Sequence, residues 1–302
     1  MPDKDYEVII LGAGPAGLQA AIHASRAKVK VLVLGREHKS SISRAHVENY
    51  CCLGTVDGEM LLKAGRHQAE KSGTRFLDED VIETEREGDW FKIKTESGLE
   101  LKTRALILAM GVSRNRLNIP GEKELLGRGV SYCVDCDAGF YRGERVAVVG
   151  DESAAVSGAL TMLFYADEVQ LIFLELGVSP VLAEQIRKSS VIMHPGRRPQ
   201  EIIGRDRVDA LILDDGARLE VSGVFIELGA KGAIELASAL GVALDPESMK
   251  FIVADKKQQT NISGVYAAGD ICGPPWQVAK AVGEGCVAGL EAAGYAKKFR
   301  TA

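Results

Sequence analysis

The residues with the clearest chemical potential are Cys133 and Cys136, which are separated by two positions and followed directly by Asp137. A Cys-x-x-Cys pair either cycles between dithiol and disulfide or binds a thiophilic metal. A structural zinc site needs four ligands, usually from a second pair of this kind. The chain has no second pair with that spacing, and its five histidines are far apart in sequence. We therefore favour redox chemistry, expect no metal site, and keep two inert buried thiols as an alternative.

The other four cysteines receive no chemical role. Cys272 and Cys286 have small, apolar neighbours and are expected to pack in the interior. Cys51 and Cys52 are adjacent, and a disulfide between neighbouring residues is strained. Six cysteines in 302 residues are also too few for a disulfide scaffold.

A glycine-rich segment near the N-terminus could bind a dinucleotide. The sequence GAGPAG at 12–17 follows a β-branched run and precedes an alanine-rich pattern that predicts a helix. Its glycines allow a tight turn and close approach of a pyrophosphate, and the helix N-terminus offers unpaired N–H groups. A second apolar run at 29–34 completes a strand, turn, helix and strand.

The same pattern returns later in the chain. Residues 144–150 predict a strand that enters a turn, 153–166 a helix, and 168–176 the next strand. Residues 76–111 predict a small antiparallel insertion that returns to a core strand. Residues 207–229 have a similar length and a similar sequence pattern. The chain is therefore predicted to be an α/β protein with two related Rossmann-like domains.

Near the C-terminal end, a strand ends in Ala-Gly-Asp and a helical segment rich in small residues follows. Asp270 would thus stand at the C-terminal end of a strand, where open α/β sheets bind ligands. A turn acid without a ligand is the simpler alternative.

The bulk composition excludes several functions. A net charge of −5 argues against a general nucleic-acid or anionic-membrane binder, because both need a basic face. No apolar run approaches the roughly 18 to 20 residues that span a bilayer. The acidic start MPDKDYEVIIL leads into a strand rather than a signal peptide, so a cytoplasmic location is expected.

The motifs, taken in order, resemble those of the low-molecular-weight thioredoxin reductases. They are GAGPAG at 12–17, VENY at 47–50, ALILAMG at 105–111, CVDCD at 133–137, VAVVG at 146–150 and GVYAAGD at 264–270. The resemblance covers nearly the whole chain. It implies an FAD-binding domain formed by residues 1–112 and 244–302, with residues 113–243 as an inserted domain that carries the cysteine pair.

The resemblance also assigns roles to individual residues. Cys133 and Cys136 would form the redox disulfide, with one sulfur reduced by the flavin and the other attacking the substrate. Asp137 would protonate the leaving thiolate, although Asp is also a common turn residue. The residues expected to contact FAD are Gly12, Gly14, Pro15, Ala16, Gly17, Asn49, Gly111, Gly269, Asp270, Trp276, Gln277 and Val278.

The second turn departs from the family. After the strand at 144–150 the sequence reads Gly-Asp-Glu-Ser-Ala-Ala, so Glu152 replaces the glycine that lets a backbone approach a pyrophosphate. The segment 173–180 contains none of the basic residues that hold the 2′-phosphate of NADPH in relatives. Glu175 stands where an NAD-specific acid would bind ribose hydroxyls, which keeps NADH as an alternative donor.

The flavin side differs from the family as well. His38-Lys39-Ser40 replaces a Gly-Gly-Gln, and Trp276-Gln277-Val278 replaces the Arg-Gln-Ala that lies along the isoalloxazine. Trp276 could stack on a flavin ring or fill a crevice.

We therefore predict an FAD-dependent disulfide oxidoreductase that does not use NADPH. The resemblance points to the atypical branch, whose members take electrons from ferredoxin or hold a second FAD in the vacated nucleotide region. A protein disulfide such as thioredoxin would be the substrate, and a homodimer is implied. An NADH-dependent reductase and a non-enzymatic flavin-binding protein are the alternatives. A basic cluster that could bind ferredoxin contains Arg187, Lys188, Arg197 and Arg198.

Overall fold

The computed structural model describes residues 4–43, 45–112, 116–228 and 232–300. The chain divides into two compact units. Unit 1 contains the described parts of Met1–Thr95, Leu99–Val112 and Leu236–Ala302, and unit 2 contains Glu96–Gly98 and the described part of Ser113–Glu235. Both are built around parallel sheets, so the predicted α/β class with two Rossmann-like domains is confirmed.

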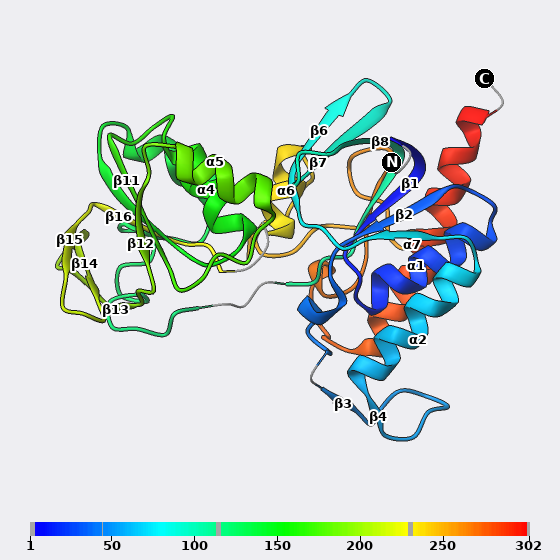
Figure 1. The fold of residues 1–302 in the computed structure, drawn as a ribbon. Coiled ribbons are helices and arrows are strands. Elements are labelled where there is room, and N and C mark those ends of the chain that lie inside the picture. Colours follow the sequence, from blue (N-terminus) through cyan, green and yellow to red (C-terminus); the bar gives the residue numbers. More distant parts are fainter. Residues whose placement is uncertain (1–3, 44, 113–115, 229–231, 301–302) are drawn as a thin grey trace. The chain divides into compact units, whose positions relative to one another are not determined.

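The main sheet of unit 1 has a parallel part and an antiparallel part (Figure 1). The order β5-β2-β1-β8 is parallel, and β17 also pairs with β8 in parallel. The hairpin β6-β7 joins β8 in antiparallel register, as predicted for residues 76–111. The strands are β1 (Asp5–Leu11), β2 (Val31–Leu34), β5 (Arg75–Leu77), β6 (Val81–Glu87), β7 (Trp90–Thr95), β8 (Glu100–Leu108) and β17 (Val265–Ala267).

Helix α1 (Pro15–Arg26) packs against both α2 (Gly58–Lys71) and α7 (Val278–Lys297). Small residues allow a close approach of α1 and α7, since a Cβ at Gly285 would lie 2.2 Å from the Ala16 carbonyl oxygen. Short elements complete the unit: β3 (His46–Val47), β4 (Val56–Asp57), and the 3₁₀ helices η1 (Glu37–Lys39), η3 (Asp270–Cys272) and η4 (Lys298–Arg300).

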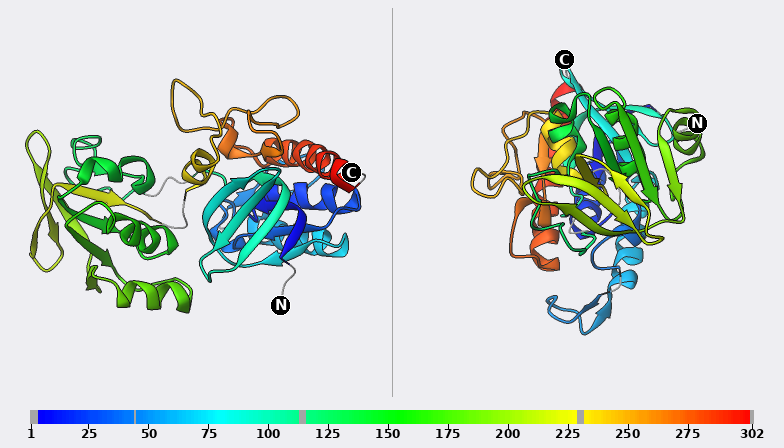
Figure 2. Two further views of the ribbon diagram at one scale, coloured as in Figure 1. Left: turned by 90° about the horizontal axis from the view of Figure 1, so that it is seen from above. Right: turned by 90° about the vertical axis from the view of Figure 1, so that its left-hand side faces the viewer.

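Unit 2 has a parallel sheet in the order β12-β11-β10-β16-β9 and a separate antiparallel sheet β13-β14-β15 (Figure 2). Its helices are α3 (Val134–Asp137), α4 (Ser153–Met162), α5 (Pro180–Lys188) and the 3₁₀ helix η2 (Ala138–Tyr141). Helix α6 (Ala233–Ala239) crosses the boundary between the units. The strands are β9 (Val130–Ser131), β10 (Arg145–Val149), β11 (Glu168–Phe173), β12 (Ile192–Pro195), β13 (Pro199–Gly204), β14 (Val208–Leu213), β15 (Arg218–Glu220) and β16 (Gly223–Ile226).

The two units differ where their antiparallel strands meet the parallel sheet. In unit 1 the nine residues of β8 pair with β7 through their first half and with β17 through their second half. In unit 2 the corresponding stretch breaks between β15 and β16, so the two sheets are separate. None of the helices in the described ranges is long and apolar enough to cross a membrane.

Candidate active site

The glycine turn at 12–17 has the backbone geometry that its sequence predicts. Gly12 has a φ of +111°, and its N–H donates to the Leu34 carbonyl oxygen at 2.8 Å. A Cβ on Gly12 would lie 2.3 Å from the Ala109 carbonyl oxygen, and one on Gly17 only 1.9 Å from the Gly12 carbonyl oxygen. Any side chain at either position would displace the backbone. The turn therefore keeps the ends of β1 and β8 close together beneath the start of α1.

The start of α1 fits an anionic ligand. Gly14 is the N-cap residue, Pro15 is in the first turn, and no side chain caps the helix. The first N–H groups of a helix lack partners within it and attract negative charge. The turn thus has the geometry that suits the pyrophosphate of a dinucleotide, and it is formed by Gly12, Gly14, Pro15, Ala16 and Gly17.

The acid predicted at the end of β17 is carried by a short 3₁₀ helix beside the glycine turn. A Cβ at Gly269 would lie 2.9 Å from Ala16 Cβ, so the two segments are in close contact. Lys280 Nζ donates to the Gly269 carbonyl oxygen at 2.8 Å, and the Gly269 N–H donates to Glu284 Oε2 at 2.8 Å. Asp270 follows directly as the first residue of η3. Lys280 and Glu284 were missed from the sequence, although their spacing of four on a helix was the available signal.

Two further residues predicted at the flavin are joined directly. Asn49 Nδ2 donates to Gln277 Oε1 at 2.8 Å, although 228 positions separate them. Gln277 is the N-cap residue of α7, Val278 is its first residue, and the neighbouring Trp276 is 47% exposed. The Asn49 loop and the start of α7 are thus in direct contact.

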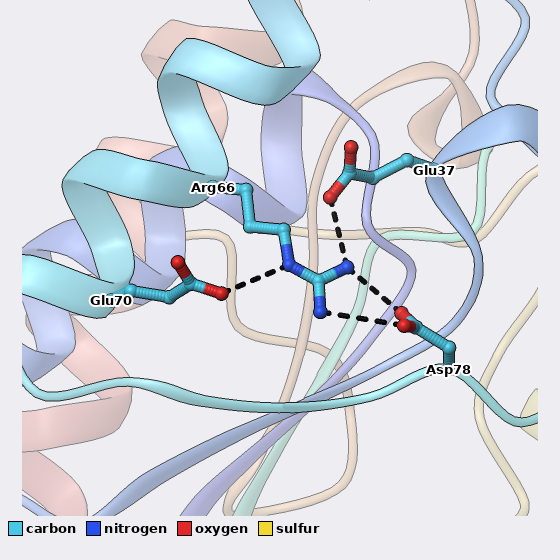
Figure 3. A network of polar contacts seen from close by, with 4 residues as sticks. All are labelled: Glu37, Arg66, Glu70 and Asp78. Carbon is cyan, nitrogen blue, oxygen red and sulfur yellow. Dashed lines mark hydrogen bonds and ion pairs between the residues drawn. The ribbon is translucent and has the colours of Figure 1, made fainter.

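The segment after β2 is held by an ionic network on α2 (Figure 3). Arg66 donates to Glu37 and Asp78, both at 2.9 Å, and to Glu70 at 3.0 Å. Burial alone would lower the pKa of Arg66, but the hydrogen bonds that it donates to Asp78, Glu37 and Glu70 raise the pKa above its usual value. The network fixes η1, which leads into Ser40, whose Oγ would lie 3.3 Å from a Cβ at Gly14.

The redox segment lies in unit 2, where α3 follows β9. Cys133 is disulfide-bonded. The side chain of Cys136 lies outside the described part of the chain, so its pairing with Cys133 stays a prediction. Cys51, Cys52, Cys272 and Cys286 are free thiols. Burial raises the pKa of Cys272 to about 12, so this thiol stays protonated and unreactive near neutral pH.

Ser131 connects the predicted acid to the disulfide. Its hydroxyl donates to Asp137 Oδ2 at 2.6 Å and accepts from the Cys133 N–H at 3.0 Å. Ser131 is only 4% exposed, so the residue at the centre of this bridge is buried. Sequence reasoning missed Ser131, because a serine at the end of a short strand has no distinctive pattern.

Glu227 contacts the disulfide segment from the end of β16. It is 6% exposed, and its Oε1 accepts from the Val134 N–H at 2.8 Å. Its carbonyl oxygen would lie 2.1 Å from a Cβ at Gly150, where the second turn begins. A small cavity beside it is lined by Val134, Asp135, Ala154, Ser157, Gly158, Glu227 and Glu235. Glu227 therefore links the backbone of the cysteine pair to the second turn.

Replacing Glu227 by Gln is expected to accelerate alkylation of the reduced Cys133–Cys136 pair several-fold near neutral pH. Gln keeps an oxygen that accepts the Val134 N–H but removes a negative charge, and a nearby negative charge disfavours a thiolate. Asp135 and Asp137 on α3 and Glu235 on α6 remain as acidic neighbours in both proteins. The measurement is the rate of iodoacetamide labelling against pH. An unshifted profile would contradict an electrostatic role for Glu227, and Glu220→Gln on exposed β15 is the control.

The second turn, residues 150–155, is occupied by its own acidic side chains. Asp151 Oδ1 accepts from the Leu174 N–H at 2.6 Å, and its carbonyl oxygen accepts from the Gly177 N–H at 2.8 Å. Glu152 is the N-cap residue of α4, and its Cγ would lie 3.9 Å from a Cβ at Gly177. The segment after β11 therefore folds against this turn, with a carboxylate at the helix N-terminus.

Comparison with known proteins gives a consistent family. The model of the pyridine nucleotide-disulphide oxidoreductases matches residues 6–285. A thioredoxin reductase of Aquifex aeolicus is 36% identical over 301 residues, covering 96% of this chain and 93% of that protein. The structure of the atypical thioredoxin reductase TRi from Desulfovibrio vulgaris Hildenborough has a TM-score of 0.84 at 36% identity, covering 97% of this chain and 98% of that chain.

A ferredoxin-flavin thioredoxin reductase from Clostridium acetobutylicum is also similar. Its structure has a TM-score of 0.67 at 31% identity and covers 99% of both chains. The match of the family model and the near-complete coverage of these relatives agree with the glycine turn and the disulfide-bonded Cys133. The chain therefore belongs to the pyridine nucleotide-disulphide oxidoreductase family and is a flavin-dependent disulfide reductase of the thioredoxin reductase type.

Proposed function

We propose that this enzyme reduces a protein disulfide such as that of thioredoxin with electrons from reduced ferredoxin, and that it does not use NADPH. The observation that carries the proposal is the second turn. Glu152 stands where a pyridine nucleotide would need glycine, and the segment after β11 folds against the turn through hydrogen bonds to Asp151. An electron donor that does not bind at this turn would not be blocked by these residues.

The residues of the chain divide the reaction between the two units. The glycine turn and the start of α1 would hold the pyrophosphate of FAD, and the rest of the cofactor would contact Asn49, Gln277, Val278, Trp276, Gly111, Gly269 and Asp270. The chemistry that FAD would supply when bound is a pair of electrons for the disulfide. One of the two cysteines then attacks the substrate disulfide as a thiolate, and Asp137 holds the proton that the leaving thiolate takes up. Ser131 orients Asp137 and the Cys133 backbone for this transfer.

A protein substrate has a contact point next to the cysteine pair. Phe140, on η2, is 83% exposed. An exposed aromatic side chain offers a large contact area and is typical of binding hot spots. Phe140 therefore supports a protein disulfide, rather than a small one, as the substrate of the Cys133–Cys136 pair.

The basic cluster predicted for ferredoxin is partly neutralised. Lys188 pairs with Glu184 at 2.6 Å, and Arg197 pairs with Asp215 at 3.0 Å. These carboxylates lower the positive potential available to an acidic partner, so the cluster gives only modest support. A homodimer and a cytoplasmic location remain part of the proposal, the latter because the free thiols suit a reducing compartment.

Reduced ferredoxin is expected to bleach the bound flavin and to generate thiols on thioredoxin under anaerobic conditions. Thiols are counted on separated thioredoxin after each addition of donor, and flavin is extracted to determine its stoichiometry. One FAD per chain supports direct transfer from ferredoxin, whereas two would favour a second FAD in the vacated region. Absence of flavin bleaching by ferredoxin would reject it as the donor.

A further inference from the structure

The turn that contains Cys51 and Cys52 places two exposed thiols side by side. Their Sγ atoms are 3.5 Å apart, and both residues are exposed and free. The turn lies in the loop between β3 and β4, two positions after Asn49. It belongs to unit 1, whereas the Cys133 segment belongs to unit 2. The pair is therefore separate from the disulfide already described.

The backbone conformation of this turn at Cys52 is one that glycine adopts more readily than cysteine. The Leu53 N–H donates to the Tyr50 carbonyl oxygen at 3.2 Å, which closes a four-residue turn, and Cys52 has a φ of +69°. A positive φ at the third residue is typical of a type II turn, which favours glycine there and proline before it. A non-glycine residue in the left-handed region is strained, and such strain gathers at functional sites. The thiol of Cys52 thus stands at a position where glycine would be favoured.

We propose that Cys51 and Cys52 form a second redox site, which is oxidised by small-molecule disulfides to a bond between neighbouring residues. The sulfurs must approach by about 1.4 Å to reach the bond length of about 2.05 Å, a change that side-chain rotation can supply. The Cα atoms of neighbouring residues are about 3.8 Å apart, below the usual range for disulfides. The bond is therefore strained, and strained, exposed disulfides are the labile ones that exchange readily.

The reaction balances without a further reagent. Two Cys S–H bonds and the S–S bond of the small molecule break, while the Cys51–Cys52 bond and two S–H bonds on the released thiols form. Two electrons pass from the cysteine pair to the small molecule, and the two protons go to its thiolates. The inference does not depend on the donor of the flavin or on the thioredoxin substrate.

The test uses FAD-loaded protein with Cys133→Ser and Cys136→Ser, so that only the other four thiols can react. The protein is treated with 4,4′-dithiodipyridine in its folded state and digested, and the peptide containing residues 51–52 is weighed. We expect it to lose two hydrogen atoms and retain no pyridylthio group. Two retained groups, or an unmodified peptide, would overturn the proposal. The same test is repeated on protein that also carries Cys51→Ser. Cys52 is then expected to retain one pyridylthio group, because it has no neighbouring thiol to displace that group. An unlabelled Cys52 would also contradict the proposal.

A second measurement addresses the turn itself. Cys52→Gly is expected to raise the melting temperature by roughly 2 °C, because glycine accepts a positive φ without strain. Cys51→Ala is the matched control and should not raise it. A lower melting temperature for Cys52→Gly would show that Cys52 stabilises the turn by packing. That result would contradict the claim that the backbone at Cys52 is strained.

Discussion

Replacing Cys133 by Ser is expected to lower the rate of thioredoxin reduction by at least ~1000-fold, the range found when an essential nucleophile is removed. Serine has nearly the same size, so the Ser131 and Asp137 contacts with the backbone should persist. It cannot form a disulfide, however, and therefore interrupts the passage of electrons from FAD to the substrate. The measurement is the steady-state rate of thiol formation on thioredoxin with a saturating donor.

The same experiment contains its own controls. The flavin spectrum and FAD content of Cys133→Ser should be unchanged, because the glycine turn of unit 1 binds the cofactor in the proposed assignment. Cys272→Ser is the matched cysteine control, since burial raises the pKa of Cys272 to about 12 and keeps it unreactive. Residual thioredoxin reduction by Cys133→Ser near the normal rate would show that another thiol carries the reaction.

The glycine turn and the elements beside it could be predicted from sequence because they depend on local patterns. A β-branched run, a glycine turn and an alanine-rich helix are adjacent in the chain, and the structure shows β1, the turn and α1 in that order. The close approach of Gly17 to the Gly12 carbonyl oxygen is likewise local. Such features follow from a few neighbouring residues.

Several of the features that escaped prediction depend on residues that are separated in the chain. Glu227 contacts Val134 across 93 positions, because parallel pairing of β16 with β9 brings their ends together. Neither segment alone contains a sequence pattern that predicts this contact. A buried glutamate at a strand end could only be interpreted after the sheet order was known. Lys280 and Glu284 were missed for a similar reason. Both lie on helix α7, but both form hydrogen bonds with Gly269, which follows strand β17.

NADPH is expected to reduce the flavin at least ~1000-fold more slowly than reduced ferredoxin. Residues 173–180 supply no Arg or Lys for the 2′-phosphate, and the Leu174 N–H is already donated to Asp151. The loss of three charge-assisted hydrogen bonds at about 1.5 kcal/mol each weakens binding by roughly 1000-fold. The carboxylate of Glu152 at the N-terminus of α4 adds repulsion to a ligand that is itself negative. Anaerobic stopped-flow mixing, followed by flavin absorbance, measures both rates.

The variant Glu152→Gly distinguishes the two reasons why NADPH is expected to be a poor donor: the carboxylate of Glu152 and the missing partners of the 2′-phosphate. Removing the side chain and its charge gives a pyrophosphate more room, but it leaves the Asp151–Leu174 hydrogen bond in place and supplies no partner for a 2′-phosphate. The variant should therefore gain more activity with NADH than with NADPH. Glu175, which follows β11, is the residue that could then hold the ribose hydroxyls of NADH. Ser153→Gly at the next position keeps Glu152 and should gain with neither nucleotide. Rapid bleaching of the unmodified protein by NADH would instead mean that Glu152 leaves the nucleotide room to bind, and the donor would be NADH rather than ferredoxin.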